Sequence, residues 1–302
     1  MGVDGVTKEA YGENLNENLD DLLKRMKQFS YRPYLVRRAY IPKGNGKMQG
    51  LGIPSFEDKV VQGVFKEILE GIYEPKFLDY SYGFRPNRSC HDAMQRVNKH
   101  IMADKVNYIV DADIRGFFDN IDHDWKIKFL EHDIADKNFI RYIKRFLIGG
   151  VMEDGKKLNT ELGTVQGGLI SPVLANVYLH YVLDTWFVHI SKREFSGEMY
   201  MVRYADDFVC LFQYEQEAQK FYRMLVERMK KFYSYVKYEL WRTKRRRDQS
   251  CWMTWGKFKE ILRIYPHRLA QSVPYQRLLK KCEFPIEEPI ALIGHDGFCE
   301  GL

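Results

Sequence analysis

Apolar and polar positions follow two periods along the chain, one typical of amphipathic helices and one typical of strands. Helical spacing predicts helices near residues 15–29, 60–72, 93–101, 139–147, 174–182 and 218–232. Short apolar or alternating runs predict strands at 34–41, 51–53, 107–110, 200–203 and 208–212. Because these elements interleave without a regular strand–helix–strand rhythm, the pattern predicts an α+β fold.

Turn-forming residues join the strands into two expected hairpins. The first surrounds Gly44-Asn45-Gly46, and the second carries Tyr204-Ala205-Asp206-Asp207 between two apolar runs. The strand at 107–110 leads into Asp111-Ala112-Asp113, so it also delivers carboxylates at its tip. The sequence therefore predicts acidic residues at the ends of separate strands.

These acidic residues are candidates for a divalent-cation site. Adjacent carboxylates such as Asp206 and Asp207 repel each other unless a positive charge lies nearby. Asp113 is a suitable third ligand, and a set of oxygen ligands favours Mg²⁺ over softer metals. Two such ions ~3.5–4 Å apart can activate an attacking hydroxyl and stabilise a leaving pyrophosphate. Taken alone, the residues leave open the simpler alternative of acids exposed at a turn.

The charge distribution points to a polyanionic partner. The chain has 47 Lys and Arg against 41 Asp and Glu, a net charge of +6. Residues 220–281 hold 18 Lys and Arg against 4 Asp and Glu, a net of +14, and the remainder carries −8. Nucleic acid is the simplest partner for such a basic end. A solvated basic helix is the alternative.

Cysteine usage and hydropathy bound the cellular setting. The 5 cysteines are odd in number and include no CxxC pair, which argues against a disulfide framework and a structural zinc site. No run of ~18 apolar residues is present to span a membrane. The first residues, MGVDGV, lack an apolar signal core. We expect a reducing, cytoplasmic setting.

Five motifs follow one another along the chain: Leu51-Gly52-Ile53-Pro54, Ser81-Tyr82-Gly83-Phe84-Arg85-Pro86, residues 111–119, residues 163–172 and the TyrAlaAspAsp hairpin. In order and spacing they resemble the motifs of the group II intron-encoded reverse transcriptase/maturase family, and the resemblance runs from about residue 2 to about residue 232. It implies the fingers and palm of a right-hand polymerase, at 1–104 and 105–232. It also implies a bacterial, nucleic-acid-associated protein.

The resemblance assigns the catalytic residues. Asp113, Asp206 and Asp207 match the metal-binding aspartates, and the metal is implied to be two Mg²⁺ ions, which Mn²⁺ can replace. Asp113 is preferred to Asp111 because it lies five residues before Phe118, the family's spacing between an aspartate and its aromatic sugar gate. Phe118 is then expected to exclude ribonucleotides by bulk, with a core aromatic as its alternative role.

Substrate contacts are implied for a second group of residues. Gln166 matches the glutamine beside the incoming nucleotide, and Gly167 and Gly168 match glycines that let the backbone approach base and template. Lys43 and Lys47, on the first hairpin, are plausible contacts for triphosphate and template, because lysine is a mobile point charge suited to phosphate. Solvated turn lysines remain the alternative. Arg85 is open between a structural role and a template-phosphate contact.

Three departures from the family affect these expectations. Gln49-Gly50 stands where the family usually has Arg-Pro, and an amide cannot replace a guanidinium–phosphate contact of ~1.5–3 kcal/mol. Val165 replaces a proline. After residue 232 the family's helical thumb is not recognisable, so we infer an internal deletion near 230–235. Residues 233–270 are expected to be a basic helical remnant of the thumb and maturase region, and 271–302 an unassigned tail.

The functional hypothesis is an RNA-directed DNA polymerase of a group II intron. It would transfer nucleotides from deoxynucleoside triphosphates to the 3′-hydroxyl of a DNA primer on an RNA template, weakened by loss of the thumb. An RNA-binding maturase-type remnant and an inactive rearranged copy are the alternatives. Retron or phage-defence reverse transcriptases fit the motifs less well.

Overall fold

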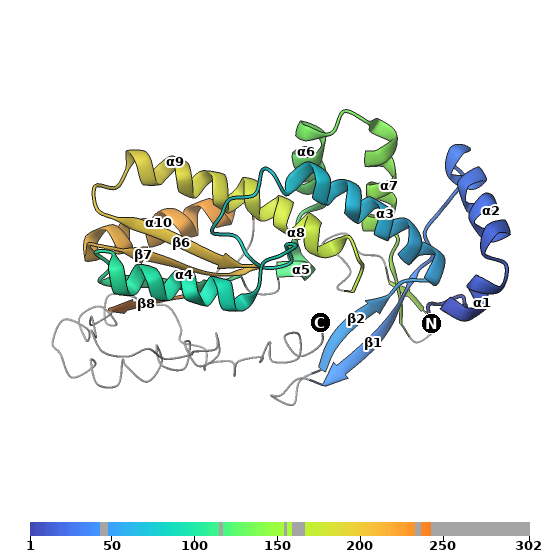
Figure 1. The fold of residues 1–302 in the computed structure, drawn as a ribbon, viewed down its shortest axis with the longest axis horizontal. Coiled ribbons are helices and arrows are strands. Elements are labelled where there is room, and N and C mark those ends of the chain that lie inside the picture. The colour runs from blue at the N-terminus through green and yellow to red at the C-terminus, as the bar shows by residue number, and fades with distance from the viewer. Residues whose placement is uncertain (43–47, 115–116, 154–155, 159–166, 233–236, 243–302) are drawn as a thin grey trace.

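Two four-stranded sheets and the helices around them form the part of the chain that the structure describes (Figure 1). The computed structural model describes residues 1–42, 48–114, 117–153, 156–158, 167–232 and 237–242. Its strands are β1 (Val36–Pro42), β2 (Met48–Ile53), β3 (Tyr108–Asp113), β4 (Val151–Glu153), β5 (Lys156–Leu158), β6 (Met199–Tyr204), β7 (Asp207–Phe212) and β8 (Lys237–Arg242).

Helices occupy most of the intervening chain. They are α1 (Lys8–Glu13), α2 (Leu15–Lys27), α3 (Phe56–Tyr73), α4 (Cys90–Ala103), α5 (Phe117–Asn120), α6 (His123–Asp133), α7 (Lys137–Ile148), α8 (Ser171–Leu179), the π-helix η1 (His180–Asp184), α9 (Thr185–Arg193) and α10 (Glu215–Phe232). Each of the helices expected from apolar spacing is present, and the α+β class is confirmed.

The first sheet, which we call the hairpin sheet, has the strand order β2-β1-β4-β5. Its β1–β2 pair is the antiparallel hairpin expected around the glycine turn, with Arg38 opposite Gly52. The short strand β4 runs parallel to β1, and β5 pairs antiparallel with β4 as the last strand of the sheet. The hairpin tip, with Lys43 and Lys47, lies outside the described residues.

The second sheet, which we call the aspartate sheet, has the order β6-β7-β3-β8 and is antiparallel throughout. The hairpin β6–β7 is the one expected to carry TyrAlaAspAsp. Strand β3 pairs with β7 on one side and with β8 on the other, so it lies inside the sheet. It ends at Asp113, so its acidic residues belong to the strand itself.

Strand β8 corrects the expectation of a helical segment for residues 237–242, the described part of 233–270. Residues 237–242 pair antiparallel with β3, with Lys237 opposite Asp113 and Arg242 opposite Tyr108. The sequence KYELWR alternates polar and apolar residues over most of its length, a strand period that the basic composition concealed. Pairing here covers the outer edge of β3, which would otherwise leave unpaired backbone groups. Residues 243–302 lie outside the described part of the chain.

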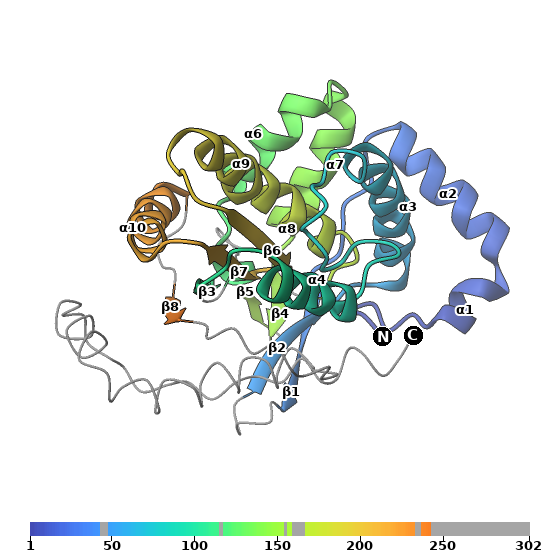
Figure 2. The ribbon, with the colours of Figure 1, turned by 60° about the vertical axis from the view of Figure 1, so that its left-hand side comes forward.

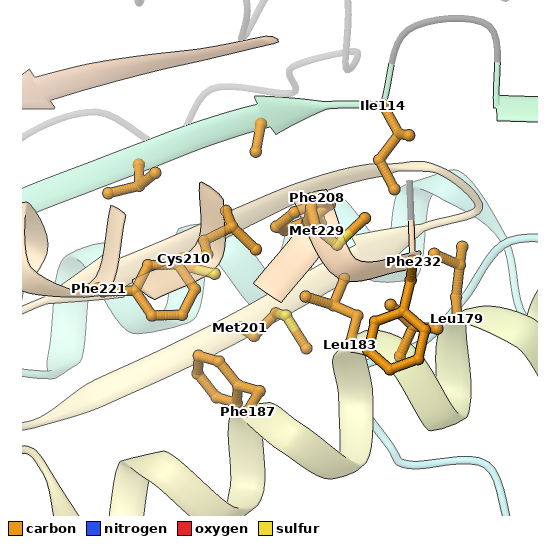
Figure 3. Close-up of a cluster of buried hydrophobic side chains, with 14 of the residues drawn as sticks. Ile114, Leu179, Leu183, Phe187, Met201, Phe208, Cys210, Phe221, Met229 and Phe232 are labelled. Carbon is orange, nitrogen blue, oxygen red and sulfur yellow. The ribbon is translucent and has the colours of Figure 1, made fainter. Parts of the chain in front are cut away.

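Helices cover both faces of the aspartate sheet (Figure 2). On one face, Phe208 and Cys210 pack against the α8–η1–α9 helix and against α10, and Figure 3 shows Phe187, Leu183 and Phe221 meeting there. On the other face, α4 packs on the part of the sheet remote from Asp113, with Ala93, Met94 and Val97 against Ile109 and Val209. Apolar side chains therefore hold β3 and β7 from both sides.

The long helix expected after Ser171-Pro172 is present but is not α-helical throughout. Its middle turn, His180–Asp184, is a π-helix between α8 and α9. The i→i+5 bonding of a π-helix widens the turn by one residue, and such turns occur frequently at functional sites. Apolar spacing did not indicate this change, because the flanking residues stay buried on both sides of it.

Candidate active site

Strand pairing brings two of the predicted aspartates face to face. Asp113 at the end of β3 is the register partner of Asp207 at the start of β7. Directly opposed residues of an antiparallel pair point to the same face of the sheet. Asp111, two residues earlier on β3, shares that face, opposite Val209. Asp113 is exposed and Asp207 half-buried, so this end of the sheet is open to a ligand.

Asp206 lies in the turn between β6 and β7. Tyr204 pairs with Asp207, so the loop contains only Ala205 and Asp206. Ala205 has a φ of 57°, in the left-handed region that two-residue hairpins use and that side chains rarely adopt. The turn thus places Asp206 next to the Asp113–Asp207 pair, but in a backbone conformation that needs support from outside.

That support includes the segment 81–86. Tyr82 N donates to Arg203 O at 2.8 Å, and Arg203 N donates to Tyr80 O at 2.8 Å. A Cβ placed on Gly83 would lie 2.3 Å from Ala205 N, so the two backbones are in direct contact. Glycine is required at this position because any side chain would push the turn away.

Arg85 has a structural role, which settles the alternative that the sequence left open. Its side chain is only 2% exposed and makes a two-pronged ion pair with Glu74. It also donates to the carbonyl oxygens of Leu78 and Ser81, at 2.7 and 2.8 Å. These bonds use the guanidinium within the protein and fold the 74–85 loop around it.

Phe118, the expected sugar gate, is half-buried in α5. Its ring meets those of Phe117 and Phe84 edge-on, with centroids 5.4 and 6.4 Å away. Phe84 is 41% exposed and has a φ of 58°, so its ring stands at the surface from a left-handed backbone. The half-buried position fits a gate whose ring also packs against the core.

The glycine loop that follows Gln166 is held to the hairpin sheet. Gly167 has a φ of 115°, and a Cβ there would lie 2.3 Å from Gly52 O. Leu169 N donates to the Gln62 side chain at 2.8 Å. Two motifs far apart in the sequence, around Gly52 and Gly167, therefore meet through their backbones. Gln166 itself lies outside the described residues.

Sequence reasoning missed two buried charged residues beneath the turn, Arg203 and Asp184. Both side chains are 0% exposed and form an ion pair at 2.6 Å. A signal was present, because Arg203 is a charge inside the apolar strand Met199–Tyr204 and Asp184 a charge inside an apolar helix. Charged residues are almost never fully buried unless they are paired.

The Cys210 thiol, whose pKa the Asp184 charge affects, is chemically unreactive. Cys210 in β7 is completely buried, and its burial, followed by the negative charge of Asp184, raises its pKa well above the ordinary value. A protonated thiol is a poor nucleophile. Cys210 is therefore not a candidate nucleophile, and the carboxylates remain the candidate groups at this end of the sheet.

The donor chemistry of the aspartates fits a divalent cation. Asp113, Asp206 and Asp207 supply only carboxylate oxygens, the ligands that Mg²⁺ prefers. Across the residues described, no group of three or more His, Cys, Asp or Glu side chains is gathered so as to hold a metal ion. The fit thus rests on the register pair and the adjoining turn.

No helix in the described ranges is long and apolar enough to cross a membrane.

Comparisons with known proteins agree on the kind of protein. The model of the reverse transcriptase (RNA-dependent DNA polymerase) family matches residues 41–244, which include β8. The group II intron-encoded protein LtrA of Lactococcus lactis is 42% identical over 183 residues, 60% of this chain and 30% of LtrA. Protein YkfC of Escherichia coli is 32% identical over 238 residues, 70% of this chain and 62% of YkfC.

A solved structure supports the fold. Telomerase from Candida albicans, in complex with a fragment of telomeric RNA, matches with a TM-score of 0.58 and 11% identity over 82% of this chain and 47% of the other. The resemblance drawn from the five motifs is confirmed, as is the reverse-transcriptase-like fold. Reverse transcriptases generally use divalent metal ions. The chain spans less than two thirds of the length of each of these relatives.

Proposed function

This chain belongs to the reverse transcriptase family, and we propose that it is an RNA-directed DNA polymerase encoded by a group II intron. The observation that carries the proposal is the cross-strand register of Asp113 and Asp207 beside the two-residue turn that holds Asp206. Nucleotidyl transfer depends on positioning and on neutralisation of charge by metal ions, so carboxylates that hold the ions serve it and no protein nucleophile is needed.

The three aspartates have distinct positions and one shared task. Asp113 and Asp207 would hold Mg²⁺ from opposed strands, and Asp206 would complete the set from the turn; two ions are expected, with Mn²⁺ as a substitute. When bound, the ions supply the charge that activates the primer 3′-hydroxyl and stabilises the leaving pyrophosphate. The protein contributes fixed carboxylate directions, so the reacting groups meet without reorganisation.

The substrate-binding residues surround that end of the aspartate sheet. Phe118 would face the sugar of the incoming deoxynucleotide, and Gly167 would admit the nucleotide close to the backbone. Gln166, Lys43 and Lys47 are proposed to contact the nucleotide, triphosphate and RNA template. The DNA primer would bring its 3′-hydroxyl to the three aspartates. On this proposal the β1–β2 hairpin belongs to the fingers, and β4 and β5 join it although they lie within 105–232, the range expected for the palm. The aspartate sheet belongs to the palm, which β8 extends beyond residue 232.

Primer extension tests the proposal directly. The purified chain is incubated with an RNA template, an annealed DNA primer, dNTPs and Mg²⁺, beside Asp206→Asn, which removes the charge and keeps the size. We expect extension by the parent and none by the variant. Asp20→Asn, an exposed residue of α2, is the matched control and should extend like the parent.

Two results would contradict the polymerase. One is absence of extension by the parent at any Mg²⁺ or Mn²⁺ concentration, and the other is equal extension by Asp206→Asn. Binding of structured intron RNA by a parent that does not extend primers would favour a maturase-type role.

A further inference from the structure

We propose that Arg203, fixed by Asp184 and Asn176, is a positioning residue that holds the Tyr204–Asp207 turn and so sets the directions of the Asp206 and Asp207 carboxylates. The inference rests on the proposed function for its catalytic consequence. The structural part of the inference, that Arg203 holds the turn in place, can be measured in a protein that shows no enzymatic activity.

The guanidinium of Arg203 divides its hydrogen bonds between a carboxylate below it and the turn above it. Its Nε and Nη2 donate to Asp184 at 2.9 and 2.6 Å, in a two-pronged ion pair. Its Nη1 donates to Asn176 Oδ1 at 2.9 Å and to the carbonyl oxygen of Ala205, also at 2.9 Å. The last bond fixes the peptide that leads directly into Asp206.

Asn176 extends the clamp to the other side of the turn. Its amide nitrogen donates to the carbonyl oxygen of Gly83 at 2.8 Å, in a buried bond. Gly83 in turn presses its backbone against Ala205. The turn is therefore held between Gly83 on one side and the Arg203 guanidinium on the other, and Asn176 joins the two.

The π-turn places Asp184 for this contact. Asp184 is the last residue of η1, where the helix is widened by one residue relative to an α-helix. Tyr80 Oη donates to the carbonyl oxygen of Asp184 at 2.9 Å, so a side chain satisfies part of the widened turn. The π-helix therefore ends at the residue that forms the ion pair with Arg203, and the side chain of Tyr80 holds that residue's carbonyl oxygen.

Burial separates this network from an ordinary ion pair. The side chains of Arg203 and Asp184 are both 0% exposed, so each charge has lost its water. A buried ion pair is often no more stabilising than apolar residues of the same volume, and its best attested use is to specify one geometry. Since Arg203 is inaccessible to substrate, it can act only through the turn.

Two variants remove different hydrogen bonds of the network formed by Arg203, Asp184 and Asn176. Arg203→Lys keeps the charge but loses the planar fork that reaches Asp184, Asn176 and Ala205 together. Asn176→Ala leaves the Arg203–Asp184 ion pair whole and removes two bonds, the one that Asn176 accepts from Arg203 and the one that it donates to Gly83. It therefore tests the turn with a smaller loss of buried charge pairing than Arg203→Lys. Arg25→Lys is the control, because Arg25 makes a similar two-pronged pair with Glu57 at 3.0 and 2.7 Å, away from the turn.

Hydrogen exchange of the peptides covering 200–212 is the primary measurement. We expect amides at 204–207 to exchange about tenfold faster or more in Arg203→Lys and Asn176→Ala, because each loses bonds that hold the turn closed. In Arg25→Lys these peptides should exchange as in the parent. Equal exchange in Asn176→Ala and the parent would overturn the proposal.

Primer extension then separates positioning from general stability. A displaced turn should lower kcat on the order of 100-fold while the KM for dNTP changes little. Equal loss of kcat in Arg25→Lys would overturn the positioning role. If the parent does not extend primers, the proposed polymerase function fails, but the exchange result still decides whether Arg203 holds the turn.

Discussion

The two sheets of this protein are stabilised in opposite ways. The aspartate sheet has helices packed on both faces, and Phe208, Cys210 and Leu211 are completely buried. The hairpin sheet exposes about half of Tyr40, Ile41 and Met48, at 52%, 50% and 56%. One sheet can hold carboxylates in fixed directions, and the other leaves large apolar side chains open to solvent.

Two contacts around the site involve backbone on both sides and no side chain. Gly83 touches the Tyr204–Asp207 turn, and Gly167 touches Gly52 of the hairpin sheet, in both instances backbone against backbone. The turn of the buried sheet and a strand of the more exposed sheet thus each contact another segment through backbone atoms. Only glycine allows these contacts, because a Cβ at either position would lie 2.3 Å from the neighbouring backbone. This comparison predicts that added methyl groups at these glycines are more harmful than many larger changes elsewhere.

The largest effect is expected for Gly83→Ala. The new Cβ would lie 2.3 Å from Ala205 N, and backbone cannot yield as a flexible side chain can. We expect a loss of about 3 kcal/mol in the free energy of unfolding, at the upper end of overpacking costs. Primer extension should fall below detection. Urea denaturation and the extension assay measure the two effects.

Gly63→Ala is the control for Gly83→Ala. Gly63 lies in α3 with open space around its would-be Cβ. There we expect a gain of about 0.5–1 kcal/mol, because alanine is the better helix former. If Gly83→Ala is as stable as the parent, the backbone at Gly83 is no more restricted than that at Gly63, and the comparison is wrong.

Gly167→Ala probes the link to the hairpin sheet. A side chain at φ 115° is strained, and the Cβ would meet Gly52 O at 2.3 Å. We expect a cost of about 2 kcal/mol and a raised KM for dNTP, because the loop would move away from the nucleotide. Titration of dNTP in the extension assay tests this. An unchanged KM would show that this backbone contact does not shape the nucleotide site.

Phe118→Val asks whether the half-buried ring serves the site or the core. If it acts as the sugar gate, removing its bulk should raise incorporation of ribonucleotides relative to deoxynucleotides by about 10-fold or more. Phe139→Val is the matched control, since Phe139 stacks on Phe65 with centroids 4.5 Å apart in another core cluster. Phe139→Val should alter stability and leave sugar selection unchanged. If Phe118→Val selects deoxynucleotides as strongly as the parent does, Phe118 serves only as a core residue.

The smallest effect is a pH dependence at His180, below the aspartate sheet. Burial is the largest effect on the pKa of His180 and lowers it. The negative charges of Asp184 and Asp133 raise this pKa, and the positive charges of Arg203 and Lys76 lower it. Among the described residues its Nδ1 has no hydrogen-bond partner. As pH falls below about 6.5, the unfolded chain takes up a proton first.

The free energy of unfolding should therefore be fully retained above that pH and decline below it, down to the folded pKa. His180→Leu, which cannot titrate, should flatten the decline. Urea denaturation at about pH 7 and about pH 5 measures the difference. An unchanged slope in the variant would assign the decline to other groups.

Local sequence determined the elements and the acidic residues of the candidate site. Period and turn chemistry suffice for the six helices expected from apolar spacing, for both hairpins and for the positions of Asp113, Asp206 and Asp207, because these signals act over a few residues. The motifs identified the family for the same reason. Strands β4, β5 and β8 were not predicted: β4 and β5 have three residues each, and the basic composition around β8 concealed its alternation.

Tertiary structure decided how those residues face one another. The register that opposes Asp113 to Asp207, the use of Arg85 within a loop and the burial of Arg203 with Asp184 all depend on contacts between distant segments. The sequence shows that Gly83 is a glycine, but not that Ala205 lies against it. A carboxylate's identity is a local property, whereas its direction is set by everything packed around its backbone.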